Sequence, residues 1–292
     1  MMGTKSITTY SGLVILSLIW GMAFVAIKEV VVELSPVNLA LLRWLVAGVP
    51  FLVLLPIIGR PKTKFERKDV PRLLIVALAN VAGYHISLNY AETTLSAGLS
   101  ALLIAFGPIF IVFLSFLLLK ERANRRLFLG LALAVAGTAV ISIGSLSIND
   151  FSSIGGIMEA LFTALCYALF TVMGKPLVQK YGSASTTILA GLVGTAMMLP
   201  LLSANFFSQV ETLSTNGWLG VLYLGLLSTV FGYLMFYALV SKGAVSRLSI
   251  QLYLIPVVSV VGGALLLSEP VTPSLILGGG MMLGAVAIST WK

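Results

Sequence analysis

The sequence predicts an all-α integral membrane protein with ten transmembrane helices, arranged as two five-helix repeats of inverted topology. Three observations lead to this fold class. Hydrophobic residues make up 59% of the 292-residue chain and charged residues only 10%, whereas soluble domains contain roughly 45–50% apolar and about 25% charged residues. The apolar residues gather in ten long segments, and one pattern of residues occurs twice.

The ten segments are each long enough to span a bilayer, because about 30 Å of hydrocarbon requires about 20 helical residues. They cover residues 10–32, 36–58, 71–92, 96–119, 126–146, 154–177, 184–203, 217–241, 246–268 and 271–291. Residues 10–32 exceed the length of a signal-peptide core and lack a small-residue cleavage site, so we expect a retained helix. Pro, Gly, Ser and charged residues separate the segments, and the gaps are too short for a soluble domain.

The repeated pattern divides the chain into two halves. Three residues recur 148 positions later with the same spacing: Pro108, Glu121 and Gly130 correspond to Pro256, Glu269 and Gly278. Earlier pairs such as Lys28 and Lys175 are 147 residues apart. We therefore expect two domains, 1–148 and 149–292, each a five-helix repeat. Five spans is an odd number, so the second half must enter the membrane from the opposite side, as in secondary transporters that work by alternating access.

The distribution of cations predicts the orientation. If the segment ends are assigned alternately to the two sides, 16 of the 18 Lys and Arg residues fall on the side of the N-terminus, while Lys28 lies on the other side and Arg43 within a span. By the positive-inside rule, both termini are cytoplasmic, in a cell membrane of the plasma or inner type. The net charge of +8 is thereby explained by contact with membrane lipid, and we expect no nucleic-acid partner.

The sequence lacks the motifs of catalytic and metal sites. The single cysteine, Cys166, lies within a span, so the chain has neither an intrachain disulfide nor a cysteine metal cluster. It also contains no nucleophile elbow, paired-histidine zinc motif or phosphate-binding loop. We expect no enzyme activity, no cofactor and no metal, and we expect transport to run on a solute or ion gradient.

The residues that carry the repeat also resemble a known family. Trp20-Gly21, Arg43, the stretch from Pro108 through Glu121-Arg122 to Gly130, and the stretch from Pro256 through Glu269-Pro270 to Gly278 are similar to the EamA type of the drug/metabolite transporter superfamily. The resemblance covers nearly the whole chain. It implies a ten-helix exporter or importer of small metabolites, with a central cavity lined mainly by helices 1, 3, 4, 6, 8 and 9.

The same resemblance implies a structural role for Arg43. An arginine within a span can also bind an anionic solute, or reach an acid such as Glu33 or Glu92 near the membrane surface. The sequence leaves these alternatives open.

Polar and aromatic side chains within the spans predict the wall of that cavity, since such groups are costly among lipid tails. They recur at helical spacing in the third, eighth and ninth segments and at equivalent places in the first and sixth. The expected substrate-binding residues are Trp20, Phe24, Asn80, Tyr84, His85, Tyr167, Thr171, Tyr233, Tyr237 and Tyr253. The alternative is ordinary helix packing, in which each interhelical hydrogen bond contributes about 0.6 kcal/mol.

Three further features leave alternatives open. His85, the only histidine, can line the cavity, carry a coupling proton or be a core residue. Pro108 and Pro256 each favour a kink within a helix, either as hinges or as fixed bends that shape the cavity. The small residues Gly280 and Gly284 favour either packing within the chain or a homodimer, so we expect a monomer or a weak homodimer.

Together these features predict a secondary-active transporter, an exporter of small organic metabolites such as amino acids or related solutes. The alternatives are a channel or an efflux protein for multiple drugs or hydrophobic cations. A membrane-embedded enzyme is disfavoured.

Overall fold

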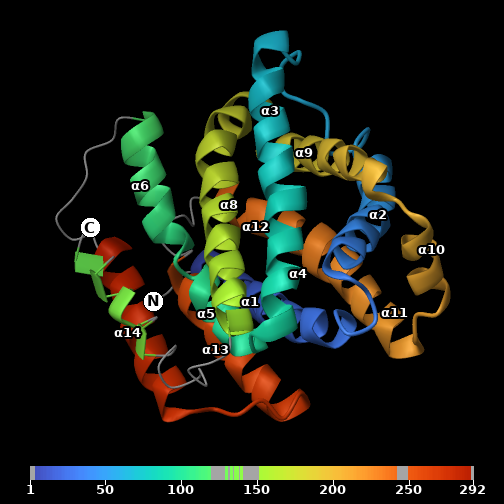
Figure 1. Ribbon diagram of the computed structural model, residues 1–292. Helices are drawn as coiled ribbons and strands as arrows, with labels where there is room; N and C mark the ends of the chain where they lie inside the picture. The colour runs from blue at the N-terminus through green and yellow to red at the C-terminus, as the bar shows by residue number, and fades with distance from the viewer. Residues whose placement is uncertain are drawn as a thin grey trace.

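The computed structural model describes residues 4–119, 129–130, 132–133, 135–137, 139–140, 151–241 and 249–290. Within these ranges every regular element is a helix (Figure 1). The elements of the first half are α1 (Thr4–Val30), α2 (Pro36–Leu54), η1 (Arg67–Asp69), α3 (Val70–Ala77), η2 (Leu78–Tyr84), α4 (His85–Thr94), α5 (Ala97–Ile104) and α6 (Gly107–Leu119). Those of the second half are α8 (Phe151–Tyr181), α9 (Ser183–Met198), η3 (Leu199–Leu201), α10 (Ala204–Glu211), α11 (Thr215–Leu222), η4 (Tyr223–Phe231), α12 (Gly232–Ser241), α13 (Ser249–Leu266) and α14 (Pro273–Thr290).

Six helical stretches in the described part of the chain are long and apolar enough to cross a membrane. They are Ser11–Val30, Pro36–Leu54, Arg67–Thr94, Ser153–Tyr181, Ser183–Leu201 and Thr215–Phe236. Three shorter apolar helices are Ala97–Ile111, Leu254–Leu266 and Pro273–Ala285. These nine stretches fall on nine of the ten expected segments. The remaining segment, 126–146, lies for the most part outside the described residues.

Two of the long stretches change their helical type midway. α3 continues into the π-helix η2 and then α4 as one column, beside which α8 runs (Figure 1). α11 continues in the same way through the π-helix η4 into α12. π-helical turns are rare and occur frequently at functional sites. Both π segments lie in the middle of their spans, where a ligand site of a transporter would lie.

The two prolines expected to kink their helices have different environments. Pro256 lies inside α13, as expected. The fourth segment is instead divided into α5 and α6, and Pro108 is the second residue of α6. Proline is well tolerated in the first turn of a helix, because its missing N–H would have no partner there. The chain at Pro108 therefore has a break between two helices, which differs from the kink within one helix that the sequence predicts there.

The connections are short and well capped. Ser35 precedes α2 and accepts a hydrogen bond from the Asn38 backbone N–H, and Ser96 caps α5 in the same way. Gly182 joins α8 to α9 with φ of 94°, a left-handed conformation that favours glycine. The gap at 204–216 contains the short helix α10, whose Phe206 is buried in the core with residues of α2 and α11.

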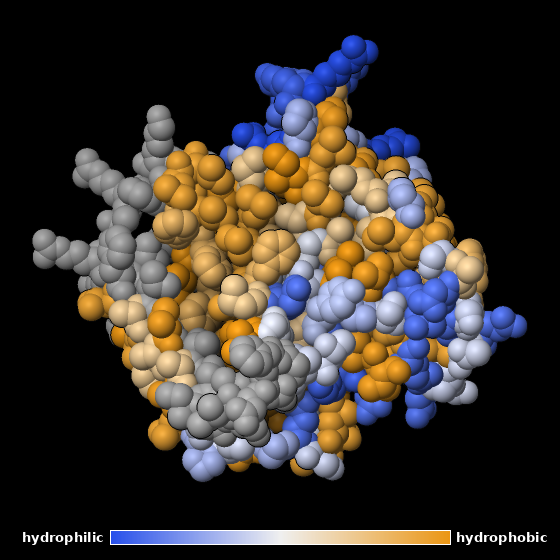
Figure 2. All heavy atoms as spheres, viewed as in Figure 1, coloured by the Kyte–Doolittle hydropathy of each residue, from blue (hydrophilic) through white to orange (hydrophobic). Residues whose placement is uncertain are grey.

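The surface is that of a protein surrounded by lipid. Figure 2 shows hydrophobic side chains over much of the visible face and hydrophilic ones gathered where α3 begins. Large apolar side chains that are exposed include Leu74, Leu78, Phe113, Phe162 and Leu219. Soluble monomers rarely expose apolar surface on this scale.

Candidate functional site

A cavity of about 510 Å³ lies in the centre of the helix bundle. Its wall includes residues of α1, α3, η2, α4, α5, α8, α12 and α13, which belong to the first, third, fourth, sixth, eighth and ninth expected segments. Two further segments contribute, through Arg43 of α2 and through Thr186, Thr187 and Ala190 of α9. The volume lies within the range typical of small-molecule sites, roughly 300–1,000 Å³.

Most of the expected site residues lie on this wall. They are Trp20, Phe24, Asn80, Tyr84, His85, Tyr167, Thr171 and Tyr233, and Pro256 lies on it as well. Tyr237 belongs to α12 and Tyr253 to α13, but the side chains of both, like that of Pro108, are outside the described residues.

Aromatic rings from four helices form two groups on the wall. The Trp20 ring lies edge-on to Tyr233, with 5.8 Å between ring centroids, and 5.4 Å from Phe236. On the other side, Tyr84 lies 6.5 Å from Tyr167, which contacts Phe170 edge-on at 5.3 Å. The indole N–H of Trp20 donates to the carbonyl oxygen of Ser228 at 3.0 Å, which fixes the orientation of the ring.

The π-helix η2 brings three of the polar residues of the third segment, Asn80, Tyr84 and His85, onto the cavity wall. In an ordinary α-helix, Asn80, Tyr84 and Ser87 share a face, and His85 lies on the adjoining one. In the structure Asn80, Tyr84, His85 and Leu88 line the cavity, while Asn89 donates its side-chain N–H to the carbonyl oxygen of Pro36. A π-turn adds a residue per turn and rotates the residues that follow it. The helical spacing of polar residues in the sequence therefore could not show which residues of the third segment share a face.

His85 is almost fully buried, and neither ring nitrogen has a hydrogen-bond partner within the described part of the chain. Its ring contacts Trp44 at 5.3 Å and Tyr84 edge-on at 4.9 Å. His85 is thus packed among aromatic rings at the edge of the cavity.

Arg43 lies on the cavity wall and is 5% exposed. Its Nε donates to the Thr229 hydroxyl at 2.9 Å, and its Nη2 donates to the Ser228 hydroxyl at 3.2 Å. Both partners are neutral, and no described carboxylate lies within ion-pair distance of the guanidinium. The expected alternative partner Glu33 instead accepts from the backbone N–H and the hydroxyl of Ser214. The wall therefore holds a buried cation whose charge has no acidic partner among the described residues.

The cavity extends to one end of the bundle and stops short of the other. Toward the α8–α9 turn its wall includes Lys175 and Gln179, both exposed. Toward the α4–α5 turn it ends at Ile27 and Leu88, which are 1% and 2% exposed. The cavity is therefore open at the α8–α9 end and closed at the α4–α5 end.

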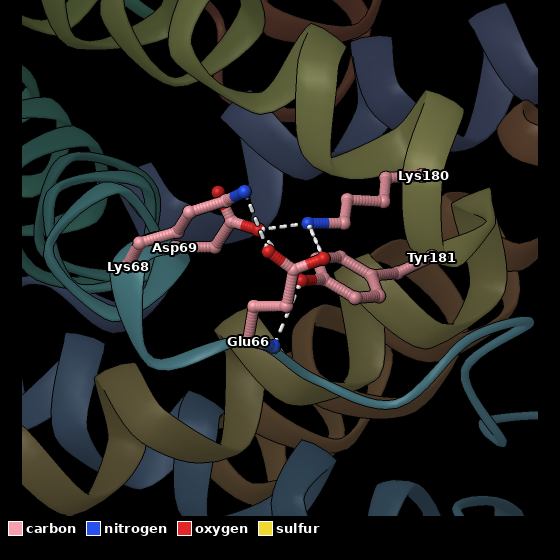
Figure 3. A network of polar contacts seen from close by, with 5 residues as sticks. All are labelled: Glu66, Lys68, Asp69, Lys180 and Tyr181. Carbon is pink, nitrogen blue, oxygen red and sulfur yellow. Dashed lines mark hydrogen bonds and ion pairs between the residues drawn. The ribbon is translucent and has the colours of Figure 1, made fainter.

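A charged network holds the open end together. Figure 3 shows Glu66, Lys68 and Asp69, at the start of α3, meeting Lys180 and Tyr181 at the end of α8. Lys180 Nζ lies 2.7 Å from Asp69 Oδ2, and the Tyr181 hydroxyl donates to the same oxygen at 2.6 Å. The hydrogen bond from Lys180, together with that from Lys68, lowers the pKa of Glu66 below its usual value.

Several wall residues were not expected from the sequence. The sequence singles out Lys175 only as the repeat counterpart of Lys28 and as one of the cations on the side of the N-terminus, and for Arg43 it leaves a structural role and contact with an anionic solute open. Phe170 and Phe236 are aromatic but stand outside the polar stripes used to find the wall. Ser228 directly precedes Thr229 in the eighth segment, and this pair of hydroxyl residues within an apolar span is the sequence signal that points to it.

Comparison with known proteins gives a consistent result. The profile of the EamA-like transporter family matches residues 7–143 and again residues 154–291. An uncharacterized transporter of Archaeoglobus fulgidus is 34% identical over 273 residues, which are 94% of this chain and 95% of the relative.

Two relatives have more specific names. A probable terminal-alkyne amino-acid exporter of Streptantibioticus cattleyicolor is 28% identical over 280 residues, with 94% of this chain and 91% of the relative covered. A probable amino-acid metabolite efflux pump of Salmonella typhimurium is 25% identical, again over 94% of this chain and 91% of the relative. A solved crystal structure matches with a TM-score of 0.64 at 16% identity, covering 97% of this chain and 96% of the other, which concerns the fold alone.

The family match covers most of the chain, the first relative exceeds 30% identity over nearly its whole length, and the helices are apolar enough to span a bilayer. The chain belongs to the EamA-like transporter family and is a multi-pass membrane transporter.

Proposed function

We propose that this protein exports amino acids or closely related small carboxylate-bearing metabolites by alternating access, and that the central cavity binds them. The proposed binding residues are those expected from the sequence: Trp20, Phe24, Asn80, Tyr84, His85, Tyr167, Thr171, Tyr233, Tyr237 and Tyr253. To these we add Arg43. The names of the two exporting relatives support the solute class and the direction.

The observation that carries the proposal is the charge balance of the wall. Arg43 is cationic and buried, and none of the described wall residues is Asp or Glu. A buried guanidinium without a carboxylate partner is costly in an apolar surrounding. A solute carboxylate would supply the missing charge through a bidentate hydrogen-bonded pair, and the aromatic rings would contact an apolar side chain.

The same charge balance opposes the alternative of hydrophobic-cation efflux. A cation in this cavity would meet Arg43 without an acid to balance it. A channel is opposed by the closed α4–α5 end, where Ile27 and Leu88 are buried.

The proposed mechanism is a rocking of two inverted repeats around the cavity. Two separate matches of one family profile support the repeat. The π segments support it as well, because residues 78–84 correspond, at the offset of 147 residues, to 225–231 within η4. We propose that the bends near Pro108 and at Pro256 accommodate this motion, with both termini cytoplasmic in a cell membrane and the open end of the cavity facing the cytoplasm.

Counterflow into liposomes tests the function. Vesicles containing purified protein and a high internal concentration of one unlabelled amino acid should take up the radiolabelled form from outside, saturably and without net current. A panel of neutral, acidic and aromatic amino acids, with their decarboxylated amines as matched controls, should show a requirement for the carboxylate. Ohmic current, or a preference for tetraphenylphosphonium over every amino acid, would contradict the proposal.

The contribution of Arg43 is tested in the same assay. Arg43→Gln should lower carboxylate-dependent counterflow at least about tenfold, equivalent to about 1.4 kcal/mol. Arg43→Lys is the matched control, because it keeps the positive charge at the same place in the wall, and it should retain more counterflow than Arg43→Gln. If Arg43→Lys loses as much activity as Arg43→Gln, the charge of Arg43 is not what the solute requires.

A further inference from the structure

The closed end of the cavity contains a carboxyl group that the transport site does not use. Glu92 lies on α4 one helical turn beyond Leu88, the last wall residue of that helix, and so on the same face. Its side chain is 0% exposed. Neither carboxyl oxygen has a hydrogen-bond partner among the described residues.

A neighbouring cation, Lys28, contacts the backbone of Glu92 and not its carboxyl group. Lys28 of α1 donates from Nζ to the carbonyl oxygens of Glu92 and Leu95, at 2.7 and 2.8 Å. These carbonyls belong to the C-terminal turn of α4, where helices leave carbonyl oxygens unsatisfied and favour positive charge. Lys28 thus binds the backbone of Glu92 and leaves its carboxyl group without a hydrogen bond.

A second charged side chain contacts the same turn. Glu269, which follows α13, accepts a hydrogen bond through Oε1 from the backbone N–H of Ala97 at 2.9 Å. Ala97 is the first residue of α5. The α4–α5 turn is therefore held by Lys28 and Glu269, one from each half of the chain, at the closed end of the cavity, where its wall ends at Ile27 and Leu88.

Charged groups near Glu92 lie on several of the elements that pack against α4. Lys28 of α1, Arg43 of α2 and Glu269 after α13 act on it electrostatically, and η2 adds the phenol of Tyr84. α5 carries no titratable side chain. α8 packs on α4 through alanines at 160 and 164, and its acid in this stretch, Glu159, is half-buried.

An ionised carboxylate that is fully buried and makes no hydrogen bond is too costly to persist, whereas burying the neutral acid costs far less. We propose that Glu92 binds a proton while the α4–α5 end is closed and releases it when that end opens. On opening, Lys28 leaves the α4 carbonyls, the proton of the Glu92 carboxyl passes to water, and the Lys28 ammonium balances the carboxylate. The link to opening rests on the alternating access proposed above, whereas the proton site itself does not.

Infrared spectroscopy of purified, solute-free protein tests the site directly. At neutral pH the wild type should show the carbonyl stretching band of a buried protonated carboxylic acid, and Glu92→Gln should lose it. Glu159→Gln, a matched acid-to-amide change on α8, should retain it. Absence of the band from the wild type, or its persistence in Glu92→Gln, would overturn the proposal. No solute is needed, so failure of amino-acid counterflow and failure of the proton site are separate results.

The link to opening is tested by distances between spin labels. In a Cys166→Ser background, labels at the exposed positions Val32 and Thr93 report on the separation of the α1 and α4 ends. Raising the pH should shift the wild-type distribution toward longer distances, and Glu92→Gln should keep the short distance at every pH. The same pH response in Glu92→Gln, or a response to Na⁺ in place of pH, would overturn the proposal. Thermal unfolding of each variant checks that it is folded.

Discussion

The hydroxyl of Tyr233 on α12 donates a hydrogen bond of 3.0 Å to the side-chain oxygen of Asn80 in η2. The two residues lie 153 positions apart and belong to the two halves of the chain. Their contact joins the π-helical third span to the eighth across the cavity wall. A solute that binds here meets an Asn80–Tyr233 pair whose hydrogen bond is already made, with the Trp20 ring beside Tyr233. Because the pair is preformed, it can orient the solute with little rearrangement of the protein.

The aromatic wall should be required for transport and not for folding. Tyr84→Ala removes a ring that contacts both His85 and Tyr167 at the cavity. We expect a several-fold rise in the half-saturating solute concentration in counterflow, with unchanged membrane insertion. Tyr90→Ala is the matched control, since Tyr90 follows on the same column but is exposed. Equal losses in both variants would remove Tyr84 from the site.

The hydroxyl of Thr229 should stabilise the bundle through Arg43. Thr229 accepts from Arg43 Nε and donates to the carbonyl oxygen of Leu224, within η4. Thr229→Val should lower the free energy of unfolding by about 1.5–3 kcal/mol, the range for hydrogen bonds to charged groups. Thermal unfolding in detergent measures this, with Thr212→Val, whose hydroxyl is exposed, as the control.

Two glycines should respond in opposite ways to alanine. A Cβ at Gly21 would stand 2.5 Å from the Val258 Cβ, between α1 and α13, so Gly21→Ala should cost about 1–3 kcal/mol of stability. A Cβ at Gly280 would meet no atom within 4 Å, so Gly280→Ala should be neutral or stabilise by up to about 1 kcal/mol.

The Gly280 variant also tests the oligomeric state. If α14 forms a homodimer through the face of Gly280 and Gly284, the added methyl should weaken it, and light scattering would show a lower mass. If light scattering shows the same monomer mass for the wild type and for Gly280→Ala, the small residues of α14 serve packing within the chain. The close approach of Gly137 to the Gly278 carbonyl is an example of such packing.

Acidification should weaken the network at the open end. The pKa of Glu66 is lowered by its contacts with Lys180 and Lys68. A lowered folded-state pKa means that the stabilising effect is present above the unfolded value of about 4.3 and is lost as the pH falls through the folded value. The melting temperature of the wild type should therefore fall more steeply than that of Glu66→Gln below about pH 4.3. The effect should be small, because the Glu66 side chain is 44% exposed and solvent screens it.

Reporter fusions test the orientation expected from the cations. Fusions after residues 65, 150 and 211 should report cytoplasm, outside and outside, because the Lys and Arg residues gather on the side of the N-terminus. An external signal at residue 65 would overturn this topology, and with it the assignment of the open end to the cytoplasm.

The sequence by itself determined the class of the protein and most of its spans. Runs of apolar residues of the required length fix where a chain can cross a bilayer, since every backbone polar group there must be satisfied within a helix. It also indicated most of the candidate wall, because polar side chains such as Asn80 are costly among lipid tails and usually face the interior of a membrane bundle.

The tertiary structure alone decided which faces meet. The π-turns of η2 and η4 rotate the residues after them, so His85 joins Asn80 and Tyr84 on one face. Arg43 reaches the cavity because hydroxyl groups 185 and 186 residues away hold it there. Lys28 binds the carbonyls of α4 and leaves the Glu92 carboxyl buried without a partner. Each of these depends on contacts between segments that are distant in the sequence. The spacing of hydrophobic residues along the chain carries no information about such contacts.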